Sequence, residues 1–84
     1  MEKQSSIYNA EFPSGTKVRI KNWQFLEEFQ RNWKFHHPLQ DFQLDCAGEA
    51  AVVSGVGYYH GGDVLYHLEK IRGIWHEACL ENFG

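Results

Sequence analysis

The chain has 84 residues and a net charge of −3 at neutral pH, which fits one small domain. Aromatic residues make up 15% of it, so a few buried rings suffice to build a compact core. Duplex nucleic-acid binders usually carry a strongly basic face, and a bilayer span needs roughly 20 apolar residues. The sequence has neither feature, so we expect no membrane segment and regard nucleic acid as an unlikely partner.

The beginning of the chain lacks the apolar stretch of a secretory signal, so we expect a soluble, cytoplasmic protein. Its two cysteines, Cys46 and Cys79, are then expected to be free thiols in a reducing compartment. A disulfide between them stays open, because sequence does not give the distance between their Cα atoms. Residues 1–11 are mostly polar and predict a flexible tail, and residues 12–84 predict a single domain.

The first predicted strand covers residues 16–21 and follows a turn signal at Pro13-Ser14-Gly15. Val18 and Ile20 alternate with three basic residues along it. Strand side chains point to opposite faces in turn, so one face is predicted buried and the other solvated.

Helical periodicity follows the first strand. Apolar residues recur three and four positions apart, and we predict a helix over residues 23–33 with Asn22 as its N-cap. Pro38 prevents the helix from continuing and favours extended backbone at the residue before it. Residues 35–46 are therefore predicted to form a long loop.

Two β-like runs, residues 49–59 and 64–71, lie on either side of Gly61-Gly62-Asp63. A glycine-rich break between such runs predicts a β-hairpin. Gly55 and Gly57 interrupt the first run and predict a bulge or a sharp bend.

A second tight turn is predicted at Arg72-Gly73, leading into a short strand over residues 74–77. Residues 78–83 predict one helical or 3₁₀ turn, with Leu80 and Phe83 packing inward. The core predicted from these patterns consists of nine residues: Val18, Ile20, Phe29, Ala51, Val53, Tyr66, Leu68, Ile74 and Leu80.

In chain order the segments read GTKVRIK, a long loop, GEAAVV, GDVLYHL and GIWHEACL. This layout resembles a small SH3-like barrel. It is also similar to the barrel domains of nitrile hydratase β subunits, with His36-His37-Pro38 ahead of the strand that follows Gly48. The resemblance implies a mostly β fold, a four- to five-stranded SH3-like barrel with one short helix in its first long loop. Such barrels serve many functions, so function has to be argued from a site.

The first candidate site is an exposed aromatic surface. Trp and Tyr suit partner surfaces because they combine an apolar body with a polar tip. In SH3-like modules, rings between the long loop and the hairpin can hold extended peptides. The alternative is that some of these rings, Trp33 and Trp75 above all, belong to the core. The candidate residues are Trp23, Trp33, Tyr58, Tyr59 and Trp75.

The second candidate is a metal or nucleophile site that uses His76, Glu77 and Cys79, with His60 as a further member. On a helical turn, residues three apart can present two ligands together. No Cys-x-x-Cys or His-Glu-x-x-His motif supports it, so structural roles are favoured for these side chains. The sequence implies no cofactor and no defined metal set.

A third candidate is the basic stripe of Lys17, Arg19 and Lys21 on one face of the first strand. We favour a solvated face that discourages edge pairing over a phosphate contact, since the whole chain is acidic.

The sequence therefore favours a non-catalytic binding or accessory module for a protein or peptide partner, with a homo-oligomer as one form of that partner. The alternative is a small enzyme or a metal-binding enzyme subunit that uses His76, Glu77 and Cys79.

Overall fold

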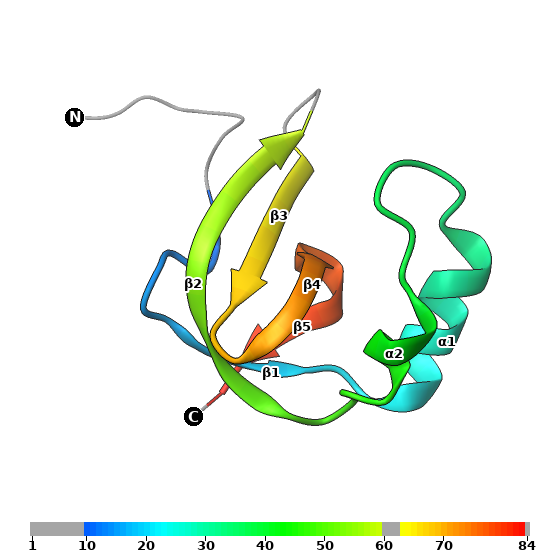
Figure 1. Ribbon diagram of the computed structural model, residues 1–84, viewed down its shortest axis with the longest axis horizontal. Coiled ribbons are helices and arrows are strands. Elements are labelled where there is room, and N and C mark those ends of the chain that lie inside the picture. Colours follow the sequence, from blue (N-terminus) through cyan, green and yellow to red (C-terminus); the bar gives the residue numbers. More distant parts are fainter. Residues whose placement is uncertain (1–9, 60–62, 84) are drawn as a thin grey trace.

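The computed structural model describes residues 10–59 and 63–83, and the fold within them is mostly β. A five-stranded antiparallel sheet has the order β4-β3-β2-β1-β5, which leaves β4 and β5 as edges of an open sheet (Figure 1). The strands are β1 (Lys17–Ile20), β2 (Ala50–Tyr59), β3 (Asp63–Leu68), β4 (Ile71–His76) and β5 (Leu80–Asn82).

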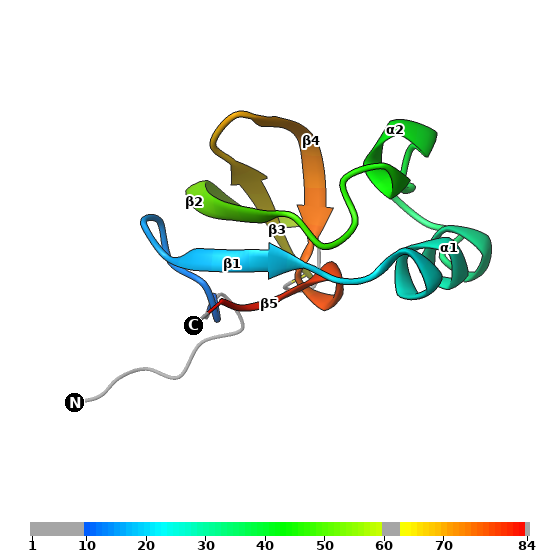
Figure 2. The ribbon, with the colours of Figure 1, turned by 90° about the horizontal axis from the view of Figure 1, so that it is seen from below.

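Two helices, α1 (Trp23–Asn32) and α2 (Asp41–Leu44), lie in the long connection between β1 and β2. Figure 2 shows both of them at the same end of the sheet, away from the C-terminus. No helix in the described part of the chain is long and apolar enough to cross a membrane.

The alternation predicted for the first strand is confirmed. Val18 and Ile20 are completely buried, whereas Lys17 and Arg19 are exposed. β1 pairs with β2 on one side and with β5 on the other. The bulge predicted in the second strand is also confirmed, because the register between β2 and β3 shifts between Val53 and Gly55.

The predicted helix is confirmed to within one residue. Asn22 is its N-cap, and its side-chain oxygen accepts a hydrogen bond of 2.8 Å from the backbone N–H of Phe25. Leu26 is completely buried and anchors α1 to the core. The helix ends at Asn32, and Trp33 is its C-cap.

The prediction of a loop throughout residues 35–46 is wrong, because α2 lies within it. The buried side chain of Gln43 fixes this one-turn helix. Its Oε1 accepts from the Gln40 N–H at 2.8 Å, and its Nε2 donates to the Ile74 carbonyl on β4 at 3.0 Å. A four-residue helix is too short to show periodicity, and its stability comes from this distant contact.

The second turn is three residues earlier than predicted. The β3–β4 hairpin turns at Glu69-Lys70, where Lys70 has a φ of 66°, and not at Arg72-Gly73. Gly73 lies inside β4 with a φ of 104°. A Cβ there would lie 3.1 Å from Gln43 Nε2. Glycine is therefore required both by the left-handed backbone and by the close approach of α2.

The end of the chain differs in part from the prediction. A 3₁₀ turn, η2 (Glu77–Cys79), is present, but the chain then continues as β5. Leu80 is buried as predicted, whereas Phe83 is only half-buried. The guanidinium of Arg19 lies 4.6 Å from the centroid of its ring.

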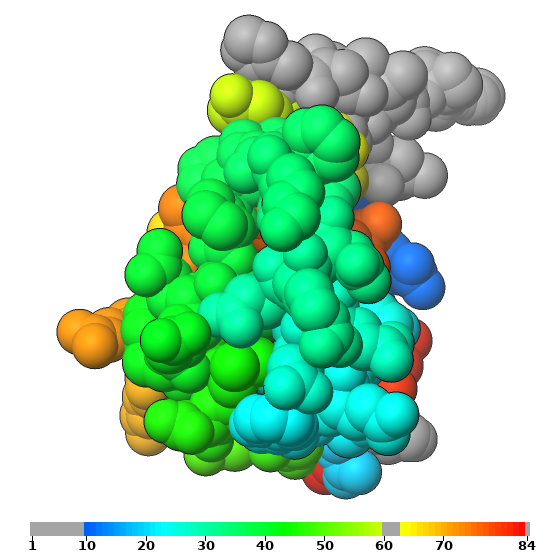
Figure 3. Space-filling view, turned by 90° about the vertical axis from the view of Figure 1, so that its right-hand side faces the viewer, coloured from blue at the N-terminus to red at the C-terminus, as the bar shows by residue number. Residues whose placement is uncertain are grey.

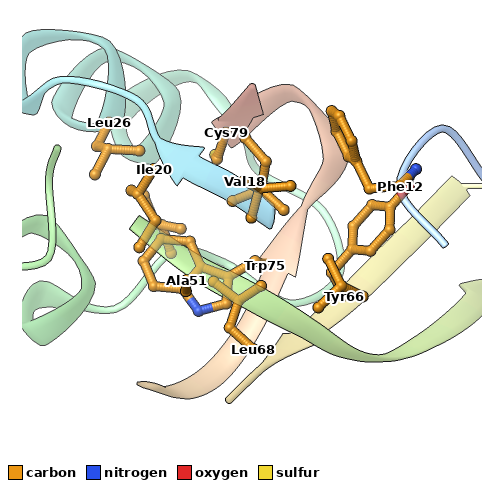
Figure 4. Close-up of a cluster of buried hydrophobic side chains, with 12 residues drawn as sticks. Phe12, Val18, Ile20, Leu26, Ala51, Tyr66, Leu68, Trp75 and Cys79 are labelled. Carbon is orange, nitrogen blue, oxygen red and sulfur yellow. Dashed lines mark hydrogen bonds between the residues drawn. The ribbon is translucent and has the colours of Figure 1, made fainter. Parts of the chain in front are cut away.

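The core lies inside the curve of the sheet, and Leu26 and Leu39 add to it from the helical connection (Figure 4). Of the nine predicted members, Phe29 and Ile74 are only partly buried, and the other seven are confirmed. Trp75 and Tyr66 are the largest completely buried side chains. Further buried members are Phe12, Leu26, Leu39, Leu65 and Cys79.

The N-terminal end of the described chain is tied to the core through Tyr66. The Tyr66 hydroxyl donates to Glu77 Oε2 at 2.6 Å and accepts from the Phe12 N–H at 3.2 Å. The Glu11 N–H donates to the same carboxylate oxygen at 3.1 Å. One buried hydroxyl thus connects β3, η2 and the segment before β1.

We expect Tyr66→Phe to lower the free energy of unfolding by about 1–3 kcal/mol, because the buried Phe12 N–H loses its acceptor. Urea denaturation followed by circular dichroism measures the effect. Unchanged stability would show that these hydrogen bonds contribute nothing.

Candidate functional site

An aromatic ladder runs along α1 and ends at its C-cap. Phe25, Phe29 and Trp33 are four residues apart, so helical geometry stacks them on one face. Their ring centroids are 6.5 Å and 5.5 Å apart, with planes inclined by 20° and 13°. Leu26 faces the core, whereas the ladder is only partly buried.

The chain after α1 extends the ladder to the hairpin. The Trp33 indole N–H donates to the His36 carbonyl at 2.6 Å, and Phe35 meets the Trp33 ring edge-on at 5.0 Å. The His36 ring stacks on Tyr59 at 3.8 Å with an inclination of 21°. We call Phe25, Phe29, Trp33, Phe35 and Tyr59 the aromatic surface. Figure 3 looks onto the side of the molecule where α1 and this loop cover the sheet.

His76, the last residue of β4, lies beneath this surface. Its Nε2–H donates to the His37 carbonyl at 2.8 Å, and its ring is 5.0 Å from Phe29 and 4.9 Å from Trp33. The His36 ring is 5.7 Å away. Burial lowers the pKa of His76, against the hydrogen bond to His37, so the ring is neutral at pH 7.

Two hollows flank the Phe29–Trp33 pair. One has a volume of about 250 Å³, follows the face of α1 and includes Phe25 and Glu28. The other, of about 200 Å³, lies between the ring pair and the junction of β4 with η2. The ladder is therefore a ridge with a hollow on each side, a shape that can hold an extended chain.

The structure brings together only some of the predicted partner-binding residues. Trp33 and Tyr59 meet through His36, and Tyr58 precedes Tyr59 on β2. Trp23 is 49% exposed at the start of α1, and no described ring pair includes it. Trp75 has no exposed surface, so its assignment to a partner surface is wrong. It occupies the core because β4 directs it inward beside Tyr66.

Sequence reasoning missed several members of this surface. Phe29 was predicted in the core and Phe25 was not predicted at any site, whereas both remain partly accessible. Phe35, at the start of the predicted loop, is 68% exposed. The four-residue spacing from Phe25 to Trp33 was a usable signal, because it places three rings on one face of the helix while Leu26 is the residue that α1 buries.

The second candidate site is not assembled in the described structure. His76 contacts the His37 carbonyl, Glu77 contacts Tyr66, and Cys79 is completely buried in the core. His60 lies outside the described residues. Within residues 10–59 and 63–83, no three His, Cys, Asp or Glu side chains are placed to hold a metal ion.

The basic stripe is divided between aromatic rings. Lys17 and Arg19 lie over Phe83 at 6.0 Å and 4.6 Å, and Lys21 lies over Phe25 at 4.6 Å. Cations over ring faces are electrostatically favourable, which gives these side chains a local role.

Comparison of the chain with family models, with curated proteins and with solved structures found no match. The site therefore has to be interpreted from its own geometry.

Burial raises the pKa of Cys79 to about 12, against the smaller effect of Lys21, so this residue is a neutral thiol at pH 7. We expect that a Cys46→Ser variant, in which Cys79 is the remaining thiol, reacts with a maleimide only after unfolding in urea. Mass spectrometry of samples taken over time measures the labelling. Rapid labelling of the folded variant would restore Cys79 as a candidate nucleophile.

The lowered pKa of His76 makes stability depend on pH. The unfolded chain binds this proton more readily, so unfolding free energy falls as pH drops through the ordinary histidine pKa of about 6.5. We expect His76→Gln, which retains an N–H donor, to lose less stability than the wild type between about pH 7.5 and pH 5. His36, His37 and Asp63 face the same ring and remain in both proteins.

Urea denaturation at each pH measures this difference. His67 is exposed on β3, so His67→Gln is the matched control and should retain the wild-type dependence. Equal pH dependence in the wild type and His76→Gln would contradict the prediction.

Proposed function

We propose that this chain is a non-catalytic binding module that recognises an extended segment of a protein or peptide partner through the aromatic surface. The observation that carries the proposal is the unbroken series of ring contacts from Phe25 on α1 to Tyr59 on β2. Phe35 and Tyr59 are 68% and 37% exposed. Contiguous exposed rings are typical of interaction sites, where they exchange water for a partner.

The arrangement of the strands supports this proposal. The order β4-β3-β2-β1-β5, with η2 between β4 and β5, fits the SH3-like barrel layout that the sequence resembles. In such modules the long first connection and the β2–β3 hairpin flank the peptide site. The aromatic surface draws its rings from these two regions.

Self-association is the variant of this function in which the partner is a second copy of the chain. Small domains gain stability when apolar surface is buried between copies. A catalytic role has weaker support, because Cys79 is buried and His76 and Glu77 have separate structural contacts.

Selection from a displayed library of random 12-residue peptides tests the proposal. We expect selected peptides to bind the wild type and to bind Phe35→Ala at least about tenfold more weakly, because the most exposed ring of the aromatic surface is lost. Phe83→Ala is the matched control, since it removes a ring that packs under Lys17 and Arg19 of β1. It adjoins the C-terminus, which Figures 1 and 2 show away from α1. Fluorescence anisotropy measures each affinity.

Binding that is equal for the wild type and Phe35→Ala would place the partner elsewhere. Sedimentation of the chain alone distinguishes self-association. A dimer that Phe35→Ala dissociates would assign the aromatic surface to a second copy. A library without binders, together with a monomer, would overturn the proposal.

A further inference from the structure

Both hollows beside the Phe29–Trp33 pair are lined by carboxylate side chains. Asp63 and Glu77 line the hollow next to η2, and Glu28 lines the hollow along α1. Among the residues that the structure describes, no lysine or arginine lines either hollow. Both sides of the ridge thus combine aromatic rings with carboxylates.

The rest of the chain supplies such rings with its own cations. The Lys21 ammonium lies 4.6 Å from the centroid of Phe25, the ring at the other end of the ladder. Within the described residues, no lysine or arginine lies over Phe29 or Trp33. Phe29 and Trp33 stack on each other and line both hollows, so the aliphatic part of a partner's lysine or arginine can pack beside these rings while its charged group reaches the carboxylates.

Glu77, one of the two carboxylates next to η2, is held in place before any partner arrives. Glu77 Oε2 accepts hydrogen bonds from the Tyr66 hydroxyl and the Glu11 N–H. Asp63 Oδ2 lies 3.3 Å from His36 Nε2, and its side chain is half exposed. Fixed acceptors lose little entropy on binding, so an incoming cation finds a preorganised site.

We infer that the partner of the aromatic surface is a basic segment, with one lysine or arginine in the hollow between Trp33 and Asp63 and another beside Glu28. The inference rests on the proposed function and adds the charge of the ligand. The net charge of −3 acts in the same direction, because it attracts basic partners over a longer range. These hollows are formed around α1, so the helix in the first connection selects the ligand.

The same peptide library tests the inference through the sequences that it yields. We expect lysine or arginine at two fixed positions of the selected peptides. A chosen peptide is then synthesised with glutamine at both positions and should bind at least about tenfold more weakly. Its affinity should also fall as salt is raised, because exposed charge pairs are screened.

Variants of the chain provide the complementary test. Glu28→Gln and Asp63→Asn should each weaken binding of the basic peptide about five- to tenfold while leaving the glutamine peptide unaffected. Glu69→Gln makes the same change of charge on the exposed β3–β4 turn and should leave both affinities within about twofold. Glu77 is left intact because it stabilises the fold through Tyr66.

The outcomes separate the two proposals. Selected peptides that depend on Phe35 but carry no basic preference would overturn the basic ligand and leave the binding module standing. Equal binding of the basic and glutamine peptides would do the same. If Glu69→Gln weakens binding of the basic peptide as much as Asp63→Asn does, the effect comes from net charge alone. That result would overturn the proposed site. Failure to select any peptide, together with a monomer in sedimentation, would remove the proposed function itself.

Discussion

The buried side chain of His76 determines where the helical connection lies on the sheet. It projects from the end of β4, donates to the His37 carbonyl, and packs against two rings of α1. His76 therefore contacts both the helix and the loop from one position on the sheet. Burial keeps that residue neutral, and a charge placed there would be close to two other imidazoles. Together with the stack of His36 on Tyr59, this contact places the rings of α1 and of the loop beside β2.

Gln43 provides a second connection between the insertion and β4. Its amide reaches the Ile74 carbonyl, and the absence of a side chain at Gly73 leaves room for it. Each buried polar atom of this kind stabilises the fold only when its partner is in place. The insertion is consequently attached to β4 at two points, which restrain the aromatic surface. A rigid surface loses less entropy on binding than a mobile loop.

The distribution of rings follows from the size of the core. Trp75 and Tyr66 fill much of the space under the short strands, and little remains for the rings of α1. Those rings cover one another instead, as a stacked ladder that is partly exposed. The surplus of aromatic residues is thus accommodated at one surface. That surface adjoins carboxylates, which is the basis for expecting a basic partner.

Local patterns determined the parts of the fold that depend on neighbours in sequence. The alternation around Val18, the cap at Asn22 and the bulge at Gly55 were predicted correctly, because each follows from backbone preference or from one buried face.

Tertiary structure decided the remaining features. Gly73 predicted a turn in the sequence, whereas in the structure it allows α2 to approach β4 closely. α2 itself depends on the hydrogen bond from Gln43 to Ile74, which are 31 residues apart. The burial of Trp75 and the exposure of Trp23 have the same origin. The composition gives the number of aromatic rings, but only the packing of distant strands determines which of them the core can hold.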